Sequence, residues 1–345
     1  MTSDMTRRDM MKVVGAAAAG LSINGKATAA DPQQRQAAPG SANPAQMGGM
    51  AIPRRPGRKN LLAWADVRNG FQHDCITHAL CVMEHLGYVS EIYDTYIRTD
   101  SQPITEHGLY GSDGQIVYGK DLKDFDAIFF FGVRQIDLTA QQRSDLLTFV
   151  YNGGGFIAAH SAATAFLPLP QFSWPEFNEM LGGEFVNHPW HIIEAPVIVD
   201  DPHFPATSFL PPSFRWHDEM YQLKNVSRDT VDVLLRLDVS KLNTSIPAVR
   251  IKNGDWPLAW AKTYGKGRVF YCALGHPRTN WDIPDMQRIY YEGIKWVLKL
   301  SDADITPHPM RPVNAAPTTL SAPTPPTGPS WALKDVAIHE RLLGS

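Results

Sequence analysis

Apolar runs alternate with helically spaced segments through the first half of the chain. Residues 126–131 (DAIFFF) and 155–159 (GFIAA) are almost continuously apolar, which is typical of strands buried on both faces of a parallel sheet. Between them, the spacing predicts a helix over residues 139–151 that opens on a capping threonine. Further upstream, the pattern predicts a strand over 60–65, a helix over 73–86 that ends at Gly87, and a strand over 88–93. This order predicts a doubly wound, mainly parallel α/β sheet.

The second half of the chain is richer in strand patterns. We expect strands over residues 191–199, 231–238, 247–251, 257–263 and 268–274, and a closing helix over 284–300. The sequence therefore predicts one domain, residues 59–300, in which extra β-strands in the second half extend the parallel sheet.

The two ends of the chain lack such patterns. Arg7 and Arg8 precede an apolar run over 13–23 and a small-residue cleavage site over 27–29, which indicates a twin-arginine signal peptide over residues 1–30 and a periplasmic or secreted protein. The apolar run is shorter than the roughly 20 residues that a membrane span needs, so we expect no membrane-spanning segment. Residues 31–58 are predicted to be a disordered linker, and residues 301–345 a Pro-rich tail.

Composition narrows the class of partner. The 345 residues carry a net charge of −3, which becomes −5 if residues 1–30, with four basic and two acidic side chains, are removed. Such a charge does not favour nucleic acid as a partner. The three cysteines show no pairing pattern, so neither a disulfide framework nor a zinc knuckle is expected.

Histidines follow three of the predicted strands. His73 comes after the first strand, His160 directly after the strand over 155–159, and His276 after the last strand. In open α/β sheets, ligands bind at the carboxyl ends of the strands. His160 occupies the strand-to-helix elbow where hydrolases place a nucleophile, but no G-x-S-x-G or G-x-C-x-G is present, so a Ser or Cys triad is not supported.

A second histidine-rich segment is H-P-W-H, residues 188–191, which follows a glycine pair. The proline stiffens this segment. His191 is a further candidate for catalysis, and His188 and Trp190 are candidates for substrate binding. Two histidines in this spacing, with a third histidine and a carboxylate from elsewhere, would also suit a divalent metal ion, so a metal cofactor is left open.

The carboxylates Asp218 and Glu219 form the remaining candidate pair. Because neighbouring side chains on an extended segment point to opposite sides, only one of the two is expected to face a pocket. The flanking rings of Trp216 and Tyr221 suit stacking on a sugar, and both are candidates for substrate binding.

Several motifs together resemble the ThuA-like (trehalose utilisation) family over about residues 59–300. They are G-F-Q-H-D at 70–74, G-G-F-I-A-A-H-S-A at 154–162, L-G-G-E-F at 181–185 with H-P-W-H, D-P-H-F-P-A-T at 201–207, D-E-M-Y at 218–221 and Y-C-A-L-G-H at 271–276. The resemblance implies a flavodoxin-like, class I glutamine amidotransferase-like fold. The nucleophilic cysteine of amidotransferases is absent, with His160 at the elbow, so amidotransferase activity is not expected.

The resemblance also implies a small-molecule carbohydrate as substrate, either a trehalose-like disaccharide or its 3-keto derivative. On this hypothesis, His160 and His191 are candidate bases, Asp218 or Glu219 is the acid or orienting carboxylate, and His73 and His276 bind oxygen atoms of the substrate. The alternatives are a non-catalytic carbohydrate-binding protein and a structural partner in an exported complex. The oligomeric state is left open.

Overall fold

A computed structural model of the chain describes residues 54–68, 72–110, 116–117, 119–134, 136–165, 173–312 and 318–320, which all belong to one compact unit, Gly49–Ser345. The predicted signal peptide, most of the predicted linker and the end of the predicted tail lie outside these residues. The described helices are α2 (Ile76–Ser90), α3 (Ala140–Tyr151), α4 (Pro175–Leu181) and α5 (Pro284–Val297). Short 3-10 turns are η2 (Leu122–Asp124), η3 (His160–Thr164), η5 (Val239–Lys241) and η6 (Arg278–Asp282).

The described strands form one large sheet and two small ones. In spatial order, the large sheet consists of β14 (Thr318–Thr319), β9 (Ser213–Glu219), β8 (Ile192–Val199), β11 (Asp232–Leu237), β12 (Pro257–Tyr264), β13 (Gly267–Cys272), β6 (Gly155–Ala159), β5 (Ala127–Phe130), β1 (Lys59–Trp64) and β2 (Tyr93–Arg98). The small sheets pair β7 (Glu184–Asn187) with β10 (Gln222–Lys224) and β3 (Leu109–Tyr110) with β4 (Ile116–Val117).

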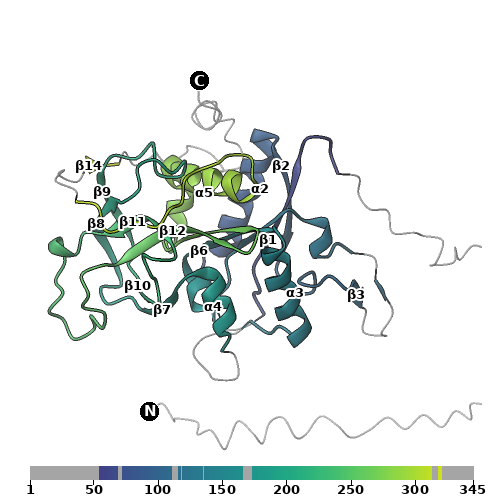
Figure 1. The fold of residues 1–345 in the computed structure, drawn as a ribbon, viewed down its shortest axis with the longest axis horizontal. Helices are drawn as coiled ribbons and strands as arrows, with labels where there is room; N and C mark the ends of the chain where they lie inside the picture. The colour runs from purple at the N-terminus through teal and green to yellow at the C-terminus, as the bar shows by residue number, and fades with distance from the viewer. Residues whose placement is uncertain are drawn as a thin grey trace, which may run out of the picture. The chain divides into compact units, whose positions relative to one another are not determined.

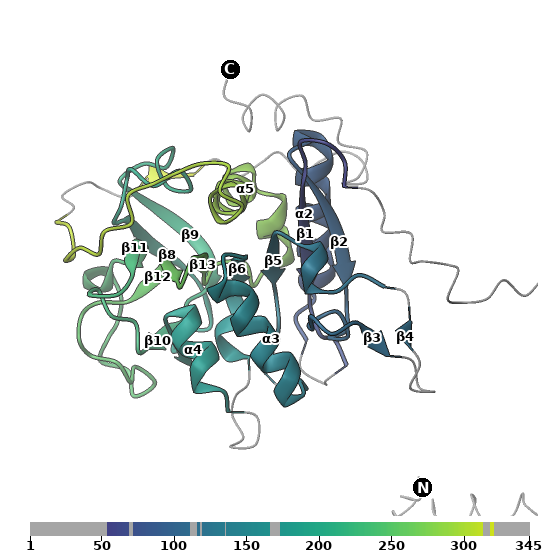
Figure 2. The same cartoon turned by 45° about the vertical axis from the view of Figure 1, so that its right-hand side comes forward.

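The large sheet has a parallel half and an antiparallel half. Strands β2, β1, β5, β6 and β13 pair in parallel, whereas β12, β11, β8 and β9 continue the sheet in antiparallel order from β13. Helices α2 and α5 contact each other on one face of the parallel half, and α3 and α4 contact each other on the opposite face (Figures 1 and 2). This three-layer arrangement confirms the predicted α/β fold with extra strands in its second half.

The apolar pattern locates the central parallel strands β5 and β6 correctly. Every residue of β5 and β6 is buried, as expected for central strands covered on both faces. Helix α3 begins after Thr139, whose side chain accepts a hydrogen bond from the Gln142 backbone in a capping box.

Two strand predictions are wrong. Helix α2 continues through Gly87 to Ser90, so residues 88–90 are helical and β2 begins only at Tyr93. Gly87 does not end the helix. Its missing side chain makes room for the Tyr93 ring, which would lie 2.5 Å from a Cβ at this position.

The expected strand over 247–251 is a loop. The side chain of Gln222 takes the place of a strand partner there, because its Oε1 accepts from the Arg250 backbone N–H at 2.8 Å and its Nε2 donates to the Ile251 carbonyl at 2.9 Å. The predictions also omitted helix α4 and strands β7, β9 and β10.

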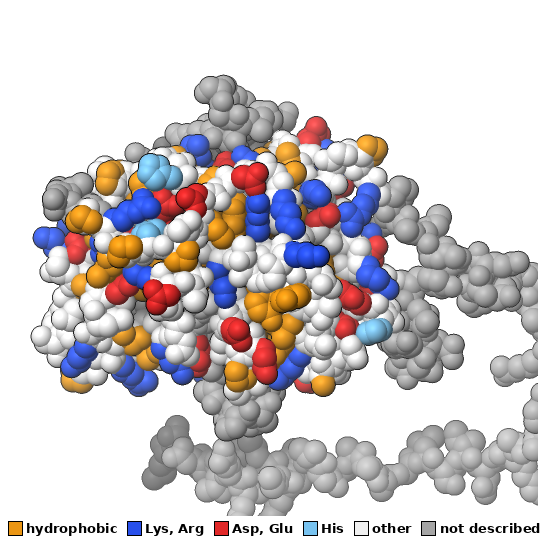
Figure 3. All heavy atoms as spheres, viewed as in Figure 1, with side chains coloured by type: hydrophobic (Ala, Val, Ile, Leu, Met, Phe, Trp, Pro, Cys, Tyr) orange, Lys and Arg blue, Asp and Glu red, His pale blue; other side chains and the backbone are white. Residues whose placement is uncertain are grey.

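Two observations bear on possible partners, one on surface charge and one on the helices. On the face drawn in Figure 3, acidic and basic side chains are intermixed, without a broad area of one sign. Among the described residues, none of the helices has both the length and the apolar character that crossing a membrane requires.

Candidate functional site

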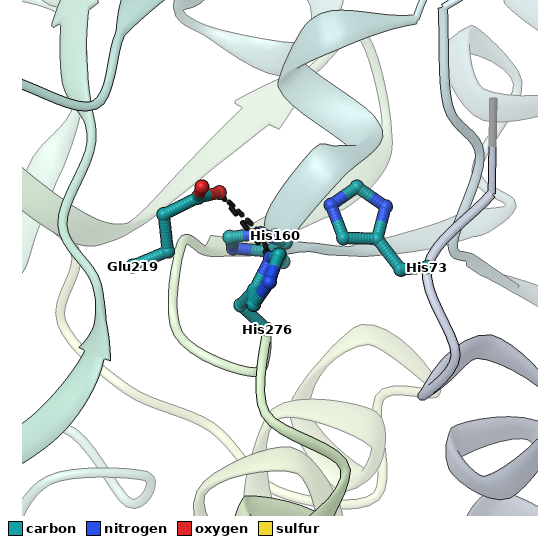
Figure 4. A group of neighbouring side chains, drawn as sticks. All are labelled: His73, His160, Glu219 and His276. Carbon is teal, nitrogen blue, oxygen red and sulfur yellow. Dashed lines mark hydrogen bonds and ion pairs between the residues drawn. The ribbon is translucent and has the colours of Figure 1, made fainter. Parts of the chain in front are cut away.

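Four side chains from four segments meet at one edge of the sheet. His160 follows β6 directly, His276 lies in the loop after β13, and His73 lies between β1 and α2. Four successive antiparallel pairings separate β13 from β9, so β9 runs in the same direction as β13 and its last residue, Glu219, lies at the same edge. Figure 4 shows the three imidazoles and the carboxylate directed toward one another. We call these four residues the histidine cluster.

His160 is fixed by its surroundings in a strained conformation. Its φ is 41°, in the left-handed region, which costs a non-glycine residue about 1–3 kcal/mol. The fully buried side chain places Nδ1 2.6 Å from the carbonyl oxygen of Ala273, and the Tyr271 hydroxyl donates to the His160 carbonyl at 2.8 Å. Because a carbonyl only accepts hydrogen bonds, Nδ1 carries a proton, and Nε2 is the ring nitrogen that faces the cluster.

Glu219 contacts three imidazoles. Its Oε2 lies 3.4 Å from His160 Nε2 and 3.3 Å from His276 Nδ1, and its Oε1 lies 3.5 Å from His188 Nε2. Burial alone would raise the pKa of Glu219, but its hydrogen bonds with His160 and His276 outweigh burial and hold the pKa well below the usual range. The same carboxylate raises the pKa of His276 despite the opposing effect of burial. The cluster therefore contains an ionised carboxylate.

His73 and Tyr221 enclose His160 from two sides. The His73 ring meets the rings of His160 and His276 edge-on, with centroids 5.2 and 4.8 Å apart. Burial and the two neighbouring imidazoles lower the pKa of His73 to about 3, so its ring is neutral. The Tyr221 ring packs on that of His160 at 4.3 Å, and its hydroxyl lies 2.8 Å from His160 Nε2. Burial raises the pKa of Tyr221, which keeps this hydroxyl protonated.

Asp218 holds the loop that carries His276. Its side chain is fully buried, and its two oxygens accept from the Gly275 backbone N–H at 2.7 Å and the His276 backbone N–H at 2.9 Å. The Asn280 amide and the Trp216 indole N–H donate to the same carboxylate at 2.9 and 3.1 Å. Asp218 and Glu219 therefore point to opposite sides of β9, and only Glu219 faces the cluster.

The histidine cluster has the composition of a metal site. Each of its four residues offers one ligand atom, and these atoms lie within 4.8 Å of one another. Imidazole nitrogens with one carboxylate oxygen suit divalent transition metals such as Zn²⁺.

Comparisons with known proteins agree with this fold. A family model described as trehalose utilisation, ThuA, matches residues 60–297. The chain belongs to the ThuA family. A comparison with curated proteins finds no match.

Solved structures of ThuA-like proteins share the fold. A putative ThuA-like protein from Bacteroides uniformis is 23% identical, with a TM-score of 0.57 over 71% of this chain and 94% of its own. One from Parabacteroides merdae is 18% identical, with a TM-score of 0.52 over 72% of this chain and 92% of its own. These proteins thus share the fold that the apolar pattern predicted.

The structure brings together most of the residues that the sequence singled out. The ThuA-family motifs G-F-Q-H-D, A-A-H-S and A-L-G-H supply the three histidines of the cluster, and D-E-M-Y supplies Glu219 and Tyr221. His188 reaches the cluster through Glu219.

Three candidates lie elsewhere. His191 is exposed, at a positive φ of 57°, and touches the His188 ring at 5.1 Å rather than the cluster. Trp190 packs on Trp256, and its indole N–H donates to the Asn243 carbonyl. Trp216 and Tyr221 are only 3% and 2% exposed, so neither ring offers a free face for stacking on a sugar. The Trp216 indole supports Asp218, and the Tyr221 hydroxyl contacts His160.

Two supporting groups were not anticipated. The Ala273 carbonyl fixes the tautomer of His160, and Asn280 links Asp218 to the His217 carbonyl on β9 at 3.0 Å. A backbone carbonyl and a lone asparagine carry no pattern in a single sequence.

Proposed function

We propose that this chain is an exported enzyme of the ThuA family that acts on trehalose-like disaccharides or on their 3-keto derivatives. The observation that carries the proposal is the meeting of three imidazoles around the ionised Glu219 at the carboxyl edge of the sheet. The twin-arginine pattern at residues 7–8 supports export, and the family supports a carbohydrate substrate.

The chemistry of a 3-keto sugar suits such a site. The carbonyl acidifies the C–H bond at C2, so a base removes this proton, the electron pair forms the C1–C2 double bond, and the C1–O bond to the second sugar breaks. A proton delivered to the departing oxygen gives a free sugar and an unsaturated ketone, and addition of water to that ketone completes a net hydrolysis.

The partly exposed imidazoles are the groups that a substrate can reach. The side chains of His276 and His188 are 27% and 34% exposed, whereas that of His160 is fully buried. The carboxylate of Glu219 contacts all three rings and orients them. We therefore assign proton exchange with the substrate to His188, which contacts Glu219, and a supporting role in the reaction to the buried His160.

The proposal is tested with the full chain. The protein is incubated with trehalose and, separately, with 3-keto-trehalose, and both sugars are followed by NMR. Release of glucose from either sugar is the expected result. If both sugars stay intact while their resonances broaden in the presence of the protein, the chain is a carbohydrate-binding protein and the enzyme proposal is wrong.

A further inference from the structure

The distances within the histidine cluster match those around a bound metal ion. His160 Nε2 and His276 Nδ1 are 3.2 Å apart, and Glu219 Oε2 lies 3.4 and 3.3 Å from them. Zinc holds imidazole nitrogen and carboxylate oxygen at about 2.0–2.2 Å, so neighbouring ligands of a tetrahedral ion are about 3.3 Å apart. The three atoms thus form a nearly equilateral triangle of the right size to hold such an ion.

We propose that His73, His160, His276 and Glu219 bind one divalent transition-metal ion, with Zn²⁺ as its representative. The three atoms of the triangle occupy their positions already. His73 faces them from the opposite side (Figure 4), within the 4.8 Å that separates the ligand atoms. Its ring would supply the fourth ligand atom.

The orientation of the His160 ring also favours a cation at this place. Its Nδ1 lies 2.6 Å from the Ala273 carbonyl oxygen, so its Nε2 is the atom that faces His276 Nδ1 and Glu219 Oε2. An ion at the centre of the triangle would contact all three atoms at once.

The surrounding residues provide the outer support that metal ligands require. Metal-binding histidines usually donate their second N–H to a carbonyl or carboxylate, as His160 does to Ala273. The His276 backbone is held by Asp218, which is fully buried and accepts from Gly275 and Asn280 as well. Both ligands are therefore fixed before an ion arrives.

This inference deepens the proposed function: the role of the metal in the reaction rests on the proposed function. The ion would act as a Lewis acid for the carbonyl oxygen of a keto sugar. His188 contacts Glu219 but is not one of the four ligands, so its ring stays available for proton exchange with the substrate.

The test measures metal binding without any sugar. The full chain is stripped with a chelator, dialysed, and titrated with Zn²⁺ by calorimetry and with Co²⁺ by visible absorption. We expect one equivalent of Zn²⁺ per chain, and a Co²⁺ spectrum typical of a tetrahedral or five-coordinate ion. Glu219→Gln and His276→Ala should each weaken Zn²⁺ binding at least 100-fold.

A matched variant separates this site from other histidines. His217→Ala removes an exposed histidine from the same strand, two residues from Glu219, and should bind Zn²⁺ like the parent. Asp218→Asn leaves all four ligands in place and should weaken binding by about 10–100-fold, as for an outer support. Binding of no equivalent, or equal binding by the Glu219 and His217 variants, would overturn the metal site.

The two proposals fail in different ways. If the stripped protein releases glucose from 3-keto-trehalose as fast as the zinc-loaded protein, the metal has no part in the reaction and the enzyme proposal stands. If one Zn²⁺ binds with the expected dependence on Glu219 and neither sugar changes, the metal site stands and the enzyme proposal fails.

Discussion

At the scale of single residues, the buried imidazole of His160 is the centre of the site. Its ring touches Glu219, His276, Tyr221 and the Ala273 carbonyl, and its backbone is strained. A residue that is fully buried yet aimed into a polar cluster contributes to the reaction rather than to the first contact with a sugar. Loss of this ring should therefore separate turnover from binding.

We predict that His160→Gln abolishes turnover of the 3-keto sugar, lowering kcat by more than about 100-fold. The dissociation constant of the sugar should change by less than about tenfold, or roughly 1.4 kcal/mol, because the exposed residues of the site remain. Initial rates and calorimetric sugar binding check the two quantities, with His217→Gln as the control. A loss of equal size in kcat and in affinity contradicts this role.

Asp218 gives a second prediction at this scale. Asp218→Asn replaces an oxygen acceptor by an N–H donor among the donors of Gly275, His276, Asn280 and Trp216, so at least one donor loses its partner inside the core. The free energy of unfolding should fall by about 2–4 kcal/mol. Urea denaturation measures it. The control is Glu194→Gln, which removes an exposed ion pair with Arg215 and should change the free energy of unfolding by less than about 1 kcal/mol. An equally small effect of Asp218→Asn would contradict the supporting role of Asp218.

At the scale of elements, close packing of helix α2 against strand β2 requires a glycine within the helix, at Gly87. Alanine favours a helix over glycine by about 0.8–1 kcal/mol. At Gly87, however, a Cβ would lie 2.5 Å from the Tyr93 ring and 2.9 Å from the Tyr93 carbonyl oxygen. We predict that Gly87→Ala destabilises the fold by about 1–3 kcal/mol through overpacking, as measured by thermal and urea denaturation. Tyr88→Ala, at an exposed position in the next residue, is the control. A stabilised Gly87→Ala variant would show that the helix propensity of alanine outweighs the overpacking against Tyr93.

The elements also show what a single sequence can and cannot predict. The apolar runs at 127–130 and 155–159 predict the parallel strands, and the strand order then places His73, His160 and His276 at one edge. Buried and exposed residues alternate only in part along strand β9, in the antiparallel half. Which strands lie beside it depends on backbone pairing, which leaves no pattern of apolar residues in the sequence. The position of Glu219 at the same edge of the sheet could therefore not be predicted from the sequence. The loop at 247–251 was likewise beyond prediction, since its backbone partner is a distant side chain, Gln222.

At the scale of the whole molecule, residues 301–312 bind to the antiparallel half of the sheet through hydrogen bonds and ion pairs. The Arg311 backbone donates to Asp200 at 3.2 Å, and its guanidinium pairs with Asp201 at 3.3 Å. His308 Nε2 lies 3.0 Å from Asp232 Oδ1. The chain after α5 thus lies over three buried aspartates.

Asp232 makes this contact sensitive to pH. Burial, aided by the Asp201 and Asp304 carboxylates and opposed by Arg311, raises the pKa of Asp232 to about 8, while His308 also faces it. Between about pH 4 and 8, the folded state holds a proton that the unfolded state releases, so raising the pH favours unfolding by up to about 1.4 kcal/mol per pH unit. We predict that Asp232→Asn removes this slope and that its stability gain over the parent grows from pH 5 to pH 8. Melting temperatures of both proteins across this range measure the difference, in which the titrating groups remote from Asp232 cancel. Asp229→Asn, at an exposed position nearby, should keep the parental slope. If the Asp232 variant keeps it too, the buried carboxyl does not titrate in this range and the prediction is wrong.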